Sequence, residues 1–360
     1  MTTTEMTVED IQSRLTALRE EKPKMRAKDI ADALNISEGE LLAAQMGEAI
    51  IRLNDEPVEI LKAVEELGEV MALSRNKNCV HERKGVYEGL QVFGKGAAQH
   101  VLMVNPDGID LRIFISQWTS VFAVLQKGDE GPRSSLQFFD KAGVAIHKIY
   151  LTELSNSDAF MPLVARFMAD DQTPGLTVGA YDAPAKLKSD EEVNWEKFRS
   201  EWEKMQDVHE FFPMLRKFKI HRLQGHRHIG HDFAMPVATD AARKVIDLAA
   251  SKEFEIMVFV GNKGIVQIHT GQLTTVKEFG TWYNILDPKF NLHLDEEGIA
   301  ECWVTRKPTK DGLISSLEVF DKDGELIVTF FGRRTEGEPE QEVWRDILAE
   351  LPLKETQNAA

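Results

Sequence analysis

One histidine stands among regularly spaced apolar residues in the second half of the chain. His209 belongs to the segment Asp207-Val208-His209-Glu210-Phe211-Phe212. The apolar residues that share its spacing are Trp195, Phe198, Trp202, Met205, Phe212 and Leu215. Intervals of three and four residues predict a long helix over residues 192–219 with His209 on its apolar face. A neutral imidazole on an apolar wall suits a flat hydrophobic metal cofactor, for which haem is the obvious candidate, although the same pattern is typical of a hydrogen-bonded core histidine.

A second group of histidines follows shortly afterwards. Its four members are His221, His226, His228 and His231. Four imidazoles could hold zinc or form a second set of iron ligands. Gly225 and Gly230 interrupt the run, and no carboxylate or cysteine lies at metal-site spacing, so the sequence favours a solvated loop over a metal site. A third interpretation is that one of these histidines serves as an alternate haem ligand during transfer.

The composition is that of an ordinary globular protein and argues against one class of function. The chain is 42% hydrophobic and 28% charged, as is usual for a folded soluble domain. Its 360 residues exceed one ordinary hydrophobic core, so we expect two units. The formal net charge of −16 argues against nucleic-acid binding, because affinity for a polyanion requires clustered lysine and arginine.

The chain carries no sign of secretion or membrane insertion. Its opening, MTTTEMTVEDIQ, has no apolar run, and no later stretch reads as a membrane span. Cys79 and Cys302 are far apart and lack metal-ligand spacing, which excludes a thiolate zinc site or an iron–sulfur cluster held by this chain alone. Such sparse cysteine use fits a reducing compartment, so we expect a cytoplasmic protein.

Two segments of the first half recur in the second at nearly the same separation. Glu69-Val70-Met71 with Asn76-Lys77 matches Glu255-Ile256-Met257 with Asn262-Lys263. The ten residues from Ser134 to Gly143 match those from Ser315 to Gly324. Two matches at almost one offset indicate a duplicated domain, because the repeat of a solenoid is far shorter. We therefore predict two tandem repeats, residues 1–175 and 176–360.

Each repeat is expected to place its helices before its strands. The predicted helices cover roughly 8–20, 26–34, 37–46 and 55–67, then 192–219 and 238–251. The predicted strands cover 69–73, 100–104, 111–115, 120–125, 134–139 and 144–150, then 255–261, 264–269, 291–294, 299–305, 314–320 and 325–331. Hairpin-like spacing predicts largely antiparallel sheets with segregated helices, an α+β fold. The proline-containing stretch 170–190 is the predicted linker.

The stretch from Ala27 to Ser37 resembles the opening of a helix-turn-helix motif. The recognition helix would be residues 38–45, which carries Glu38 and Glu40 and no basic residue. Acidic side chains would repel phosphates, so we interpret the motif as a helical hairpin that packs on its own domain.

Four longer segments carry a resemblance to a known family. They are Asp207–Phe212, Asp110-Leu111-Arg112-Ile113-Phe114 followed by Gln117-Trp118, the stretch from Trp303 to Thr309, and Gly332-Arg333-Arg334-Thr335-Glu336-Gly337. Together with the duplication they make the chain similar to the cytoplasmic haem-utilisation family of Gram-negative bacteria, the haem-degrading and haem-trafficking HemS/ChuS/PhuS/HmuS-like proteins. The resemblance covers nearly the whole chain.

The resemblance implies a haem site in a cleft between the helix of the C-terminal half and the N-terminal half. It implies that His209 is the axial ligand of the iron, and that Arg112 lies over the opposite face of the haem as the catalytic residue, with Phe114 against the porphyrin. It implies that three cations hold the propionates, namely Arg222, Lys307 and Arg334. Family members often have a tyrosine where this chain has Phe331, so a phenol hydroxyl is absent from that edge of the haem site.

Taken without the resemblance, these residues have ordinary alternative interpretations. Arg112 alternates with Leu111 and Ile113, as a polar residue on the solvated side of a strand does. Lys307 and Arg334 are placed at strand ends or turns, where exposed charge is common. In the pairing of the two repeats, Arg112 corresponds to His293, so the halves differ at a position implied to face the haem.

The chain is thus predicted to be a haem-binding protein of haem uptake and iron acquisition. The resemblance implies a haem-degrading oxidoreductase that opens the porphyrin and releases iron with an external electron donor or reductase, since a Gly-x-Gly-x-x-Gly fingerprint is absent. The alternative is a haem chaperone that delivers haem to a separate haem oxygenase. A haem ABC transporter, approached from its cytoplasmic side, is a further candidate partner, whereas nucleic acid and membrane insertion are not expected.

Overall fold

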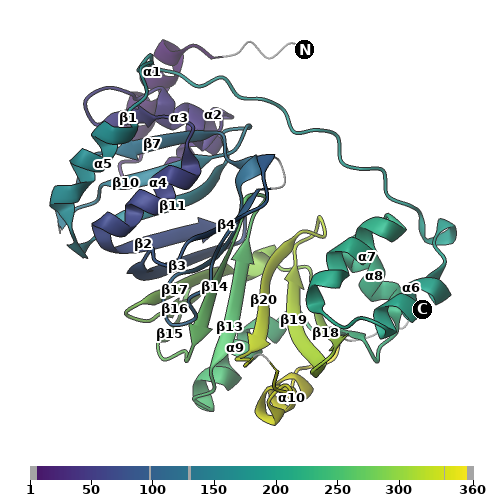
Figure 1. Ribbon diagram of the computed structural model, residues 1–360. Coiled ribbons are helices and arrows are strands. Elements are labelled where there is room, and N and C mark those ends of the chain that lie inside the picture. Colours follow the sequence, from purple (N-terminus) through teal and green to yellow (C-terminus); the bar gives the residue numbers. More distant parts are fainter. Residues whose placement is uncertain (1–5, 97–98, 129–130, 336, 355–360) are drawn as a thin grey trace. The chain divides into compact units, whose positions relative to one another are not determined.

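The computed structural model describes residues 6–96, 99–128, 131–335 and 337–354, and divides the chain into two compact units (Figure 1). Unit 1 contains Met1–Ser74, Glu82–Asp182 and Asn262–Val266. Unit 2 contains Arg75–His81, Ala183–Gly261 and Gln267–Ala360. Both units combine antiparallel strands with helices, which confirms the predicted α+β fold. No helix among the described residues has the length and apolar character needed to cross a bilayer.

Unit 1 is built from two antiparallel groups of strands. In the first group β1 (Ile50–Leu53), β7 (Ser120–Val124), β10 (Ser135–Phe139), β11 (Ala145–Ser155) and β2 (Gly68–Arg75) pair in that order. In the second group β4 (Gln91–Phe93) pairs with β5 (His100–Met103), and β5 pairs with β6 (Asp110–Phe114). Shorter strands are β8 (Lys127–Gly128) and β9 (Gly131–Pro132), and β3 (Cys79–Val86) spans the division between units.

Along the chain, the helices of unit 1 come before, between and after these strands. They are α1 (Val8–Glu21), α2 (Ala27–Leu34), α3 (Glu38–Ala43), α4 (Pro57–Ala63) and α5 (Phe160–Phe167). The Ser37 side chain accepts from the Glu40 backbone N–H and the Glu40 side chain accepts from the Ser37 N–H, which confirms the capping box that begins α3. The α1–α3 helices share a small apolar core of their own, built from residues such as Leu15, Ile30 and Leu41.

Unit 2 repeats this arrangement of strands. β12 (Ala234–Val237), β18 (Glu301–Thr309), β19 (Gly312–Phe320), β20 (Leu326–Gly332) and β13 (Ile256–Gly261) pair in that order. β15 (Val276–Phe279), β16 (Trp282–Leu286) and β17 (Phe290–Asp295) form the second antiparallel group, and β14 (Ile265–Gly271) spans the division between units. The same five-plus-three pattern in both units is the structural form of the duplication.

The helices of unit 2 are α6 (Trp195–Glu203), α7 (Phe211–Phe218), α8 (Arg222–Ile229), α9 (Ala241–Ser251) and α10 (Glu342–Ala349). The sequence-based order of helices first and strands second is therefore incomplete, because α5 and α10 close the two units after their strands. Both helices are short and strongly amphipathic, with one buried face. Short 3₁₀ turns complete the elements: η1 (Val64–Leu67), η3 (Ile115–Gln117), η4 (Ser157–Ala159), η5 (Asp190–Glu192), η6 (Val208–Glu210) and η7 (Glu296–Gly298).

The predicted linker is an extended segment. Residues 169–189, all of which the structure describes, form no helix or strand (Figure 1). Its first part is bonded to unit 1, where the Gly175 N–H donates to the Ala43 carbonyl at 3.0 Å and the Gly179 N–H donates to the Lys141 carbonyl at 2.6 Å. Tyr181 adds a hydrogen bond to Asp140. This strap is bonded to unit 2 at its other end, where the Lys188 N–H donates to the Lys219 carbonyl at 2.9 Å.

Candidate functional site

His209 lies on a short turn between two helices, so the predicted continuous helix over 192–219 is wrong. α6 ends at Glu203, the 3₁₀ turn η6 covers Val208–Glu210, and α7 begins at Phe211. The physical reason is Pro213, which has no N–H to donate to the carbonyl of residue 209. In the first turn of α7 this missing donor is harmless, because the first N–H groups of a helix have no partner within it.

The Asp207 carboxylate holds the His209 turn in place. Asp207 Oδ1 accepts from the His209 backbone N–H at 2.8 Å and lies 2.6 Å from the Nδ1 of its ring. The backbone N–H of His209 lowers the pKa of Asp207, so the carboxylate stays charged. A carboxylate on Nδ1 fixes the ring and leaves Nε2 as the nitrogen able to bind a metal.

The His209 side chain is exposed, not buried in the apolar stripe as the spacing predicted. Its exposed fraction is 90%, whereas Trp202 and Phe211 are fully buried. The break before α7 turns His209 outward while its apolar neighbours pack inward. Phe212 is 55% exposed, so an imidazole and an uncovered aromatic ring lie within four residues of each other. An exposed imidazole with one nitrogen already bonded is suited to binding an incoming metal centre.

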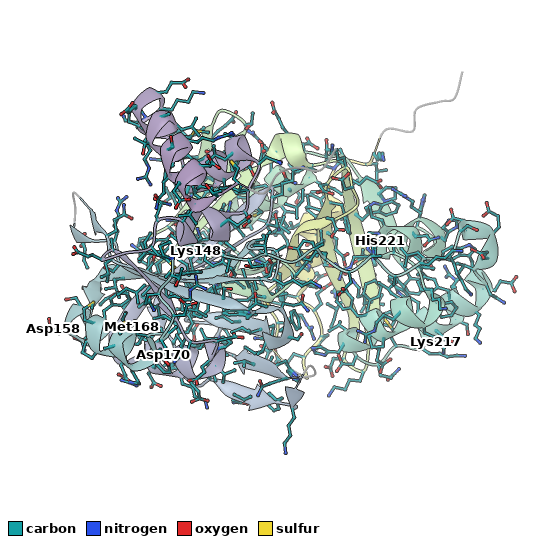
Figure 2. All side chains as sticks on the ribbon, turned by 90° about the horizontal axis from the view of Figure 1, so that it is seen from above. Lys148, Asp158, Met168, Asp170, Lys217 and His221 are labelled. Atoms are coloured by element: carbon teal, nitrogen blue, oxygen red, sulfur yellow. The ribbon has the colours of Figure 1, made fainter. Side chains whose placement is uncertain are left out.

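The histidine run after α7 forms helix α8, so the predicted solvated loop is also wrong. The His221 side chain accepts from the Leu223 N–H at 3.3 Å, and the Gln224 side chain accepts from the His221 N–H at 3.2 Å, which caps the helix. Gly225 does not break it, because the residue is the close contact with α6: a Cβ there would lie 3.2 Å from Phe198 Cζ. His221 and Lys217 mark this helical region in Figure 2.

The run does not form a metal site. Among the residues that the structure describes, no group of three or more histidine, cysteine or acidic side chains is placed to hold a metal ion. His228 stacks on Trp195, with ring centroids 4.0 Å apart, and bonds to Asp190. His226 is buried instead and joins a cluster of charged side chains.

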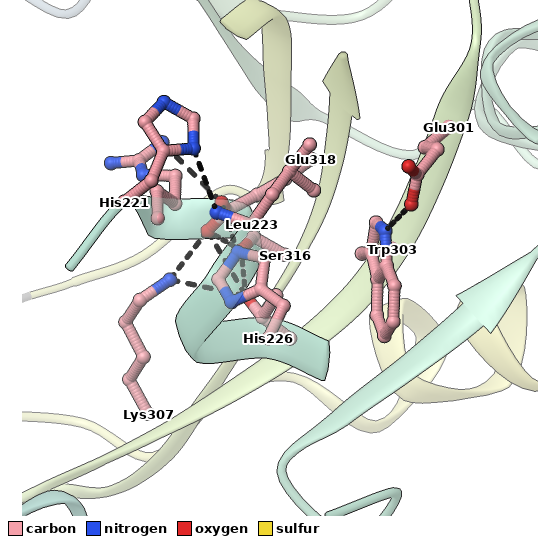
Figure 3. Close-up of polar contacts among 10 residues, drawn as sticks. His221, Leu223, His226, Glu301, Trp303, Lys307, Ser316 and Glu318 are labelled. Carbon is pink, nitrogen blue, oxygen red and sulfur yellow. Dashed lines mark hydrogen bonds and ion pairs between the residues drawn. The ribbon is translucent and has the colours of Figure 1, made fainter. Parts of the chain in front are cut away.

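The centre of that cluster is the buried carboxylate of Glu318 on β19 (Figure 3). Its Oε1 accepts from Lys307 Nζ at 2.5 Å and from Thr305 Oγ1 at 3.1 Å. Its Oε2 lies 2.9 Å from His226 Nε2 and 3.3 Å from Arg222 Nη1. One carboxylate therefore joins β18, through Lys307 and Thr305, to α8, through Arg222 and His226.

The charges of the cluster do not cancel. Burial alone would raise the pKa of the Glu318 carboxyl, but Arg222, Lys307 and His226 together hold it well below its ordinary value. Burial lowers the pKa of His226, which is therefore neutral at neutral pH. Burial also lowers the pKa of Lys307, and Glu318 opposes that effect. Two cations then surround one anion, which leaves a net positive site able to accept another carboxylate.

An aromatic pair links this cluster to the His209 turn. The Arg222 guanidinium lies 4.8 Å from the ring centroid of Phe212 and 5.3 Å from that of Phe211. Lys307 Nζ lies 4.7 Å from the centroid of Phe211. The two rings lie two and three residues after His209 in the chain, so the His209 turn is packed against the two cations.

The other predicted residues of unit 2 lie at and beyond the end of β20. Phe331 is half-buried, and its ring centroid is 5.0 Å from that of Phe259. Arg334 is half-buried just after the strand, and its Nε atom is buried without a hydrogen-bond partner among the described residues. Phe331 pairs in register with Ser316, a neighbour of the cluster. Glu336 of the same sequence segment lies outside the described residues.

Arg112 and Phe114 belong to unit 1 and share one face of β6. Leu111 and Ile113 point into the core, and Arg112 and Phe114 alternate with them. Arg112 Nη1 donates to the buried Asp110 carboxylate and, at 3.2 Å, to the Met103 carbonyl. Phe114 is 43% exposed. This face offers an anchored guanidinium beside an uncovered ring.

The β5 and β4 strands extend the aromatic character of that face. His100 pairs in register with Phe114, and Phe93 pairs with His100. The rings of Phe93 and His100 stack with centroids 5.4 Å apart. Neither residue was singled out from the sequence, where His100 began a predicted strand and Phe93 lay outside the predicted strands.

Sequence reasoning found two members of the cluster, Arg222 and Lys307, and missed the carboxylate that holds them. Lys307 is buried within β18 rather than exposed at a strand end. One signal for Glu318 was present, because the duplicated segment has glutamine, Gln137, at the same place in the first half. A charged residue that is present in only one copy of a repeat indicates a position at which the two copies differ in function.

Comparison with known proteins identifies the relatives of the chain. The family model for the haemin-degrading HemS.ChuX domain matches twice, over residues 35–167 and 219–351. The hemin transport protein HemS of Yersinia enterocolitica is 40% identical over 93% of this chain and 95% of its own length. The hemin transport protein HmuS of Yersinia pestis is 39% identical over the same shares.

Solved structures give the same result. Holo-PhuS, a heme-binding protein from Pseudomonas aeruginosa, has a TM-score of 0.93 and 41% identity, covering 97% of this chain and 100% of its own. The heme-degrading enzyme ChuS of Escherichia coli O157:H7 has a TM-score of 0.88 and 39% identity, covering 96% and 100%. With both halves matched and the full length shared, the chain belongs to the HemS/ChuX family of haemin-degrading domains.

Proposed function

We propose that this protein binds haem and acts in haem uptake and iron acquisition, with His209 Nε2 as the axial ligand of the iron. The observation that carries the proposal is the His209 turn, where Asp207 occupies Nδ1 and the rest of the ring is exposed beside Phe212. This arrangement fits a porphyrin, because the imidazole offers a bond to iron and the phenyl ring offers an apolar surface. Membership of the HemS/ChuX family supports haem as the bound molecule.

The cations of unit 2 are proposed to receive the haem carboxylates. Arg222 and Lys307 share the single charge of Glu318, so the cluster attracts a further carboxylate. Arg334 has a buried guanidinium nitrogen without a hydrogen-bond partner among the described residues, so its guanidinium is a further donor for a propionate. Phe331 would contribute an apolar contact only, since it has no hydroxyl.

In unit 1, Arg112 and Phe114 are proposed as further haem contacts. Asp110 and the Met103 carbonyl anchor Arg112 through Nη1, which leaves other guanidinium N–H groups able to donate to a bound oxygen ligand or water. Haem iron would supply the activation of oxygen or peroxide, and an external donor would supply the electrons. On this proposal Arg112 is the catalytic residue of haem degradation in the cytoplasm.

The competing function is delivery of haem to a separate haem oxygenase without turnover. The similar proteins include both descriptions, since ChuS is called a heme oxygenase and PhuS a heme-binding protein. The partner would then be the oxygenase, and in either case the cytoplasmic side of a haem ABC transporter is a candidate source of haem. We favour degradation, because the Arg112 face provides a donor suited to oxygen chemistry.

The ligand is tested by His209→Ala. We expect this variant to lose or shift the Soret band of the wild-type complex at stoichiometric haem, because the axial nitrogen is removed. The matched control is His228→Ala, whose ring is half-exposed on α8 and packs on Trp195. Equal spectra for His209→Ala and the wild type would rule out His209 as the ligand.

Degradation and delivery are separated by a turnover experiment. The haem complex is given ascorbate, or NADPH with a reductase, in air, with and without catalase. Loss of the Soret band with catalase present, together with a ring-opened tetrapyrrole, supports an enzyme. Loss only without catalase indicates damage by free peroxide and supports delivery. Arg112→Ala should keep haem binding and slow the catalase-resistant turnover.

A further inference from the structure

The buried carboxylate of Glu318 occurs in only one of the two repeated halves. In the first half its place is taken by Gln137, whose Nε2 donates to Ser135 Oγ at 3.1 Å. Thr305 pairs with Ser316, and Val124 pairs with the equivalent Ser135, so Lys307 corresponds to Gln126. The carboxylate and a cation that it holds are therefore present together in unit 2 and replaced together by amides in unit 1.

Glu318 joins two elements that lie next to the His209 turn, β18 and α8. It bonds to Lys307 on β18 and to Arg222 and His226 on α8. Phe211 of α7 covers all three partners: the two cations lie under its ring, and the His226 ring is nearly parallel to it, at 17° with centroids 6.1 Å apart. Phe211 is two residues from His209, so the packing under this ring determines where the turn lies.

We propose that Glu318 is a positioning residue of the haem site, which aligns Lys307 and Arg222 for the haem carboxylates and fixes the turn of His209 through Phe211. The inference rests on the proposed function, since it concerns the same site. Glu318 is 1% exposed and acts through its partners without touching haem. It gives a buried acidic residue a task that stability alone does not explain, because buried ion pairs add little stability.

The proposal has a specific dependence on pH. The groups that face Lys307 Nζ are Glu318 on β19 and Arg222 on α8, with His226 on the same carboxylate. Burial and Arg222 lower the pKa of Lys307, and Glu318 is the group that opposes them. If Glu318 becomes neutral, that pKa falls further, so the ammonium is lost as the pH rises. In the wild-type protein Glu318 opposes this loss, so the ammonium persists to a higher pH than in a protein without that charge.

The test compares Glu318→Gln with Glu301→Gln. Glu301 is a nearby carboxylate that accepts from Trp303 Nε1 at 3.0 Å and pairs with the exposed Arg227 (Figure 3). Its replacement by glutamine removes the same negative charge, but outside the cluster of Glu318. Affinity is measured at pH 6 and pH 9 for haem and for haem dimethyl ester, which lacks the carboxylates. For Glu318→Gln we expect a loss of about tenfold in haem affinity at pH 9, a smaller loss at pH 6, and a smaller loss for the ester. Glu301→Gln should match the wild type.

Two results would overturn the proposal. One is a Glu318→Gln protein that behaves as Glu301→Gln does at both pH values. The other is an equal loss at both pH values and for both ligands, which would indicate general loosening of the fold. A double-mutant cycle adds a further criterion: Lys307→Met and Glu318→Gln should be non-additive, because the carboxylate acts through the lysine.

A measurement without haem separates this inference from the proposed function. The charge of Lys307 is followed by the NMR shift of its Nζ across the same pH range, in wild type and in Glu318→Gln. Earlier loss of the ammonium in the variant supports positioning, and identical titrations contradict it. If His209→Ala leaves haem binding unchanged, the proposed function fails, while the lysine titration still decides whether Glu318 holds the cation.

Discussion

At the scale of single residues, the site contains pairs in which a carboxylate holds a second polar side chain in place. Asp207 orients His209, Asp110 anchors Arg112, and Glu318 holds Arg222. In each pair the histidine or arginine is the member that the family resemblance implies, and the role of its carboxylate partner was not predicted. Asp207 and Asp110 carry no sequence signal of their own, because an isolated acidic residue is common on any surface, and Glu318 is marked only by its contrast with Gln137.

Asp207→Asn is expected to weaken haem binding by about tenfold while leaving axial ligation by histidine recognisable in the spectrum. The amide can still accept from the His209 backbone N–H, but it no longer offers a charged acceptor to Nδ1, so the ring is less well oriented. Affinity is measured by haem titration. Asp171→Asn is the control, because Asp171 accepts from a backbone N–H in the same way, that of Thr173, far along the chain in the strap. Equal affinities for both variants would show that Asp207 has no orienting role.

At the scale of elements, the helices α6, α7 and α8 support the His209 turn. Their shared core contains Phe198, Trp202, Phe211, Leu215 and Leu223. α6 is joined to β18 by the Trp202 Nε1–H, which donates to the Arg306 carbonyl at 3.0 Å. The exposed His209 thus stands on a packed helical layer that is itself bonded to the strand carrying Lys307.

Gly225→Val is expected to destabilise unit 2 by about 1–3 kcal/mol, because added side-chain atoms overpack the contact between α8 and α6. The ideal Cβ already lies 3.2 Å from Phe198 Cζ and 3.4 Å from Leu215 Cδ2. Unfolding in urea measures the change. Arg227→Val, at an exposed position of the same helix, controls for the β-branched residue and removes only a surface ion pair of small value. Equal free energies of unfolding for the two variants would show that the contact between α8 and α6 tolerates the added atoms, which contradicts the prediction.

Many of the helices and strands were predictable from the sequence, and those that were missed have physical causes. The strands around Arg112 and Glu318 were predicted to within one or two residues, since each alternates or forms a continuous apolar run. The break at His209 was missed because apolar spacing was given more weight than Pro213. Helix α8 was missed because Gly225 and Gly230 were interpreted as interruptions, although one is a packing contact and the other ends the helix at a φ of 101°.

At the scale of the whole molecule, the two units share a plan and differ in their buried polar groups. Unit 1 contains a hydrogen-bonded chain in which His147 Nδ1 lies 2.8 Å from Ser74 Oγ and its Nε2 contacts the Tyr87 hydroxyl. Unit 2 contains the charged cluster of Glu318. The sequence revealed the duplication through two matching segments, but it could not reveal these clusters, because their members come from distant strands and helices.

Unit 1 is expected to lose stability in acid because of His147. Burial lowers the pKa of this residue from 6.5 to about 3, so the folded protein resists a proton that the unfolded chain accepts. The stabilisation is complete above pH 6.5 and falls by about 1.4 kcal/mol per pH unit down to the folded pKa. Trp118, whose ring lies 6.0 Å from His147, reports unfolding of unit 1 through its indole N–H resonance. His147→Gln should show a shallower decline between pH 6.5 and pH 3, and an unchanged slope would contradict the assignment.

The duplicated segment with Glu318 in one copy and Gln137 in the other has a consequence for the history of the chain. In a symmetric homodimer, one gene sets both copies of every residue, so a buried charge suited to one site is imposed on the other as well. A tandem chain is free of that constraint, and each half can mutate alone. Duplication within one chain therefore allows this position to be the acidic Glu318 in one half while its counterpart Gln137 stays neutral in the other.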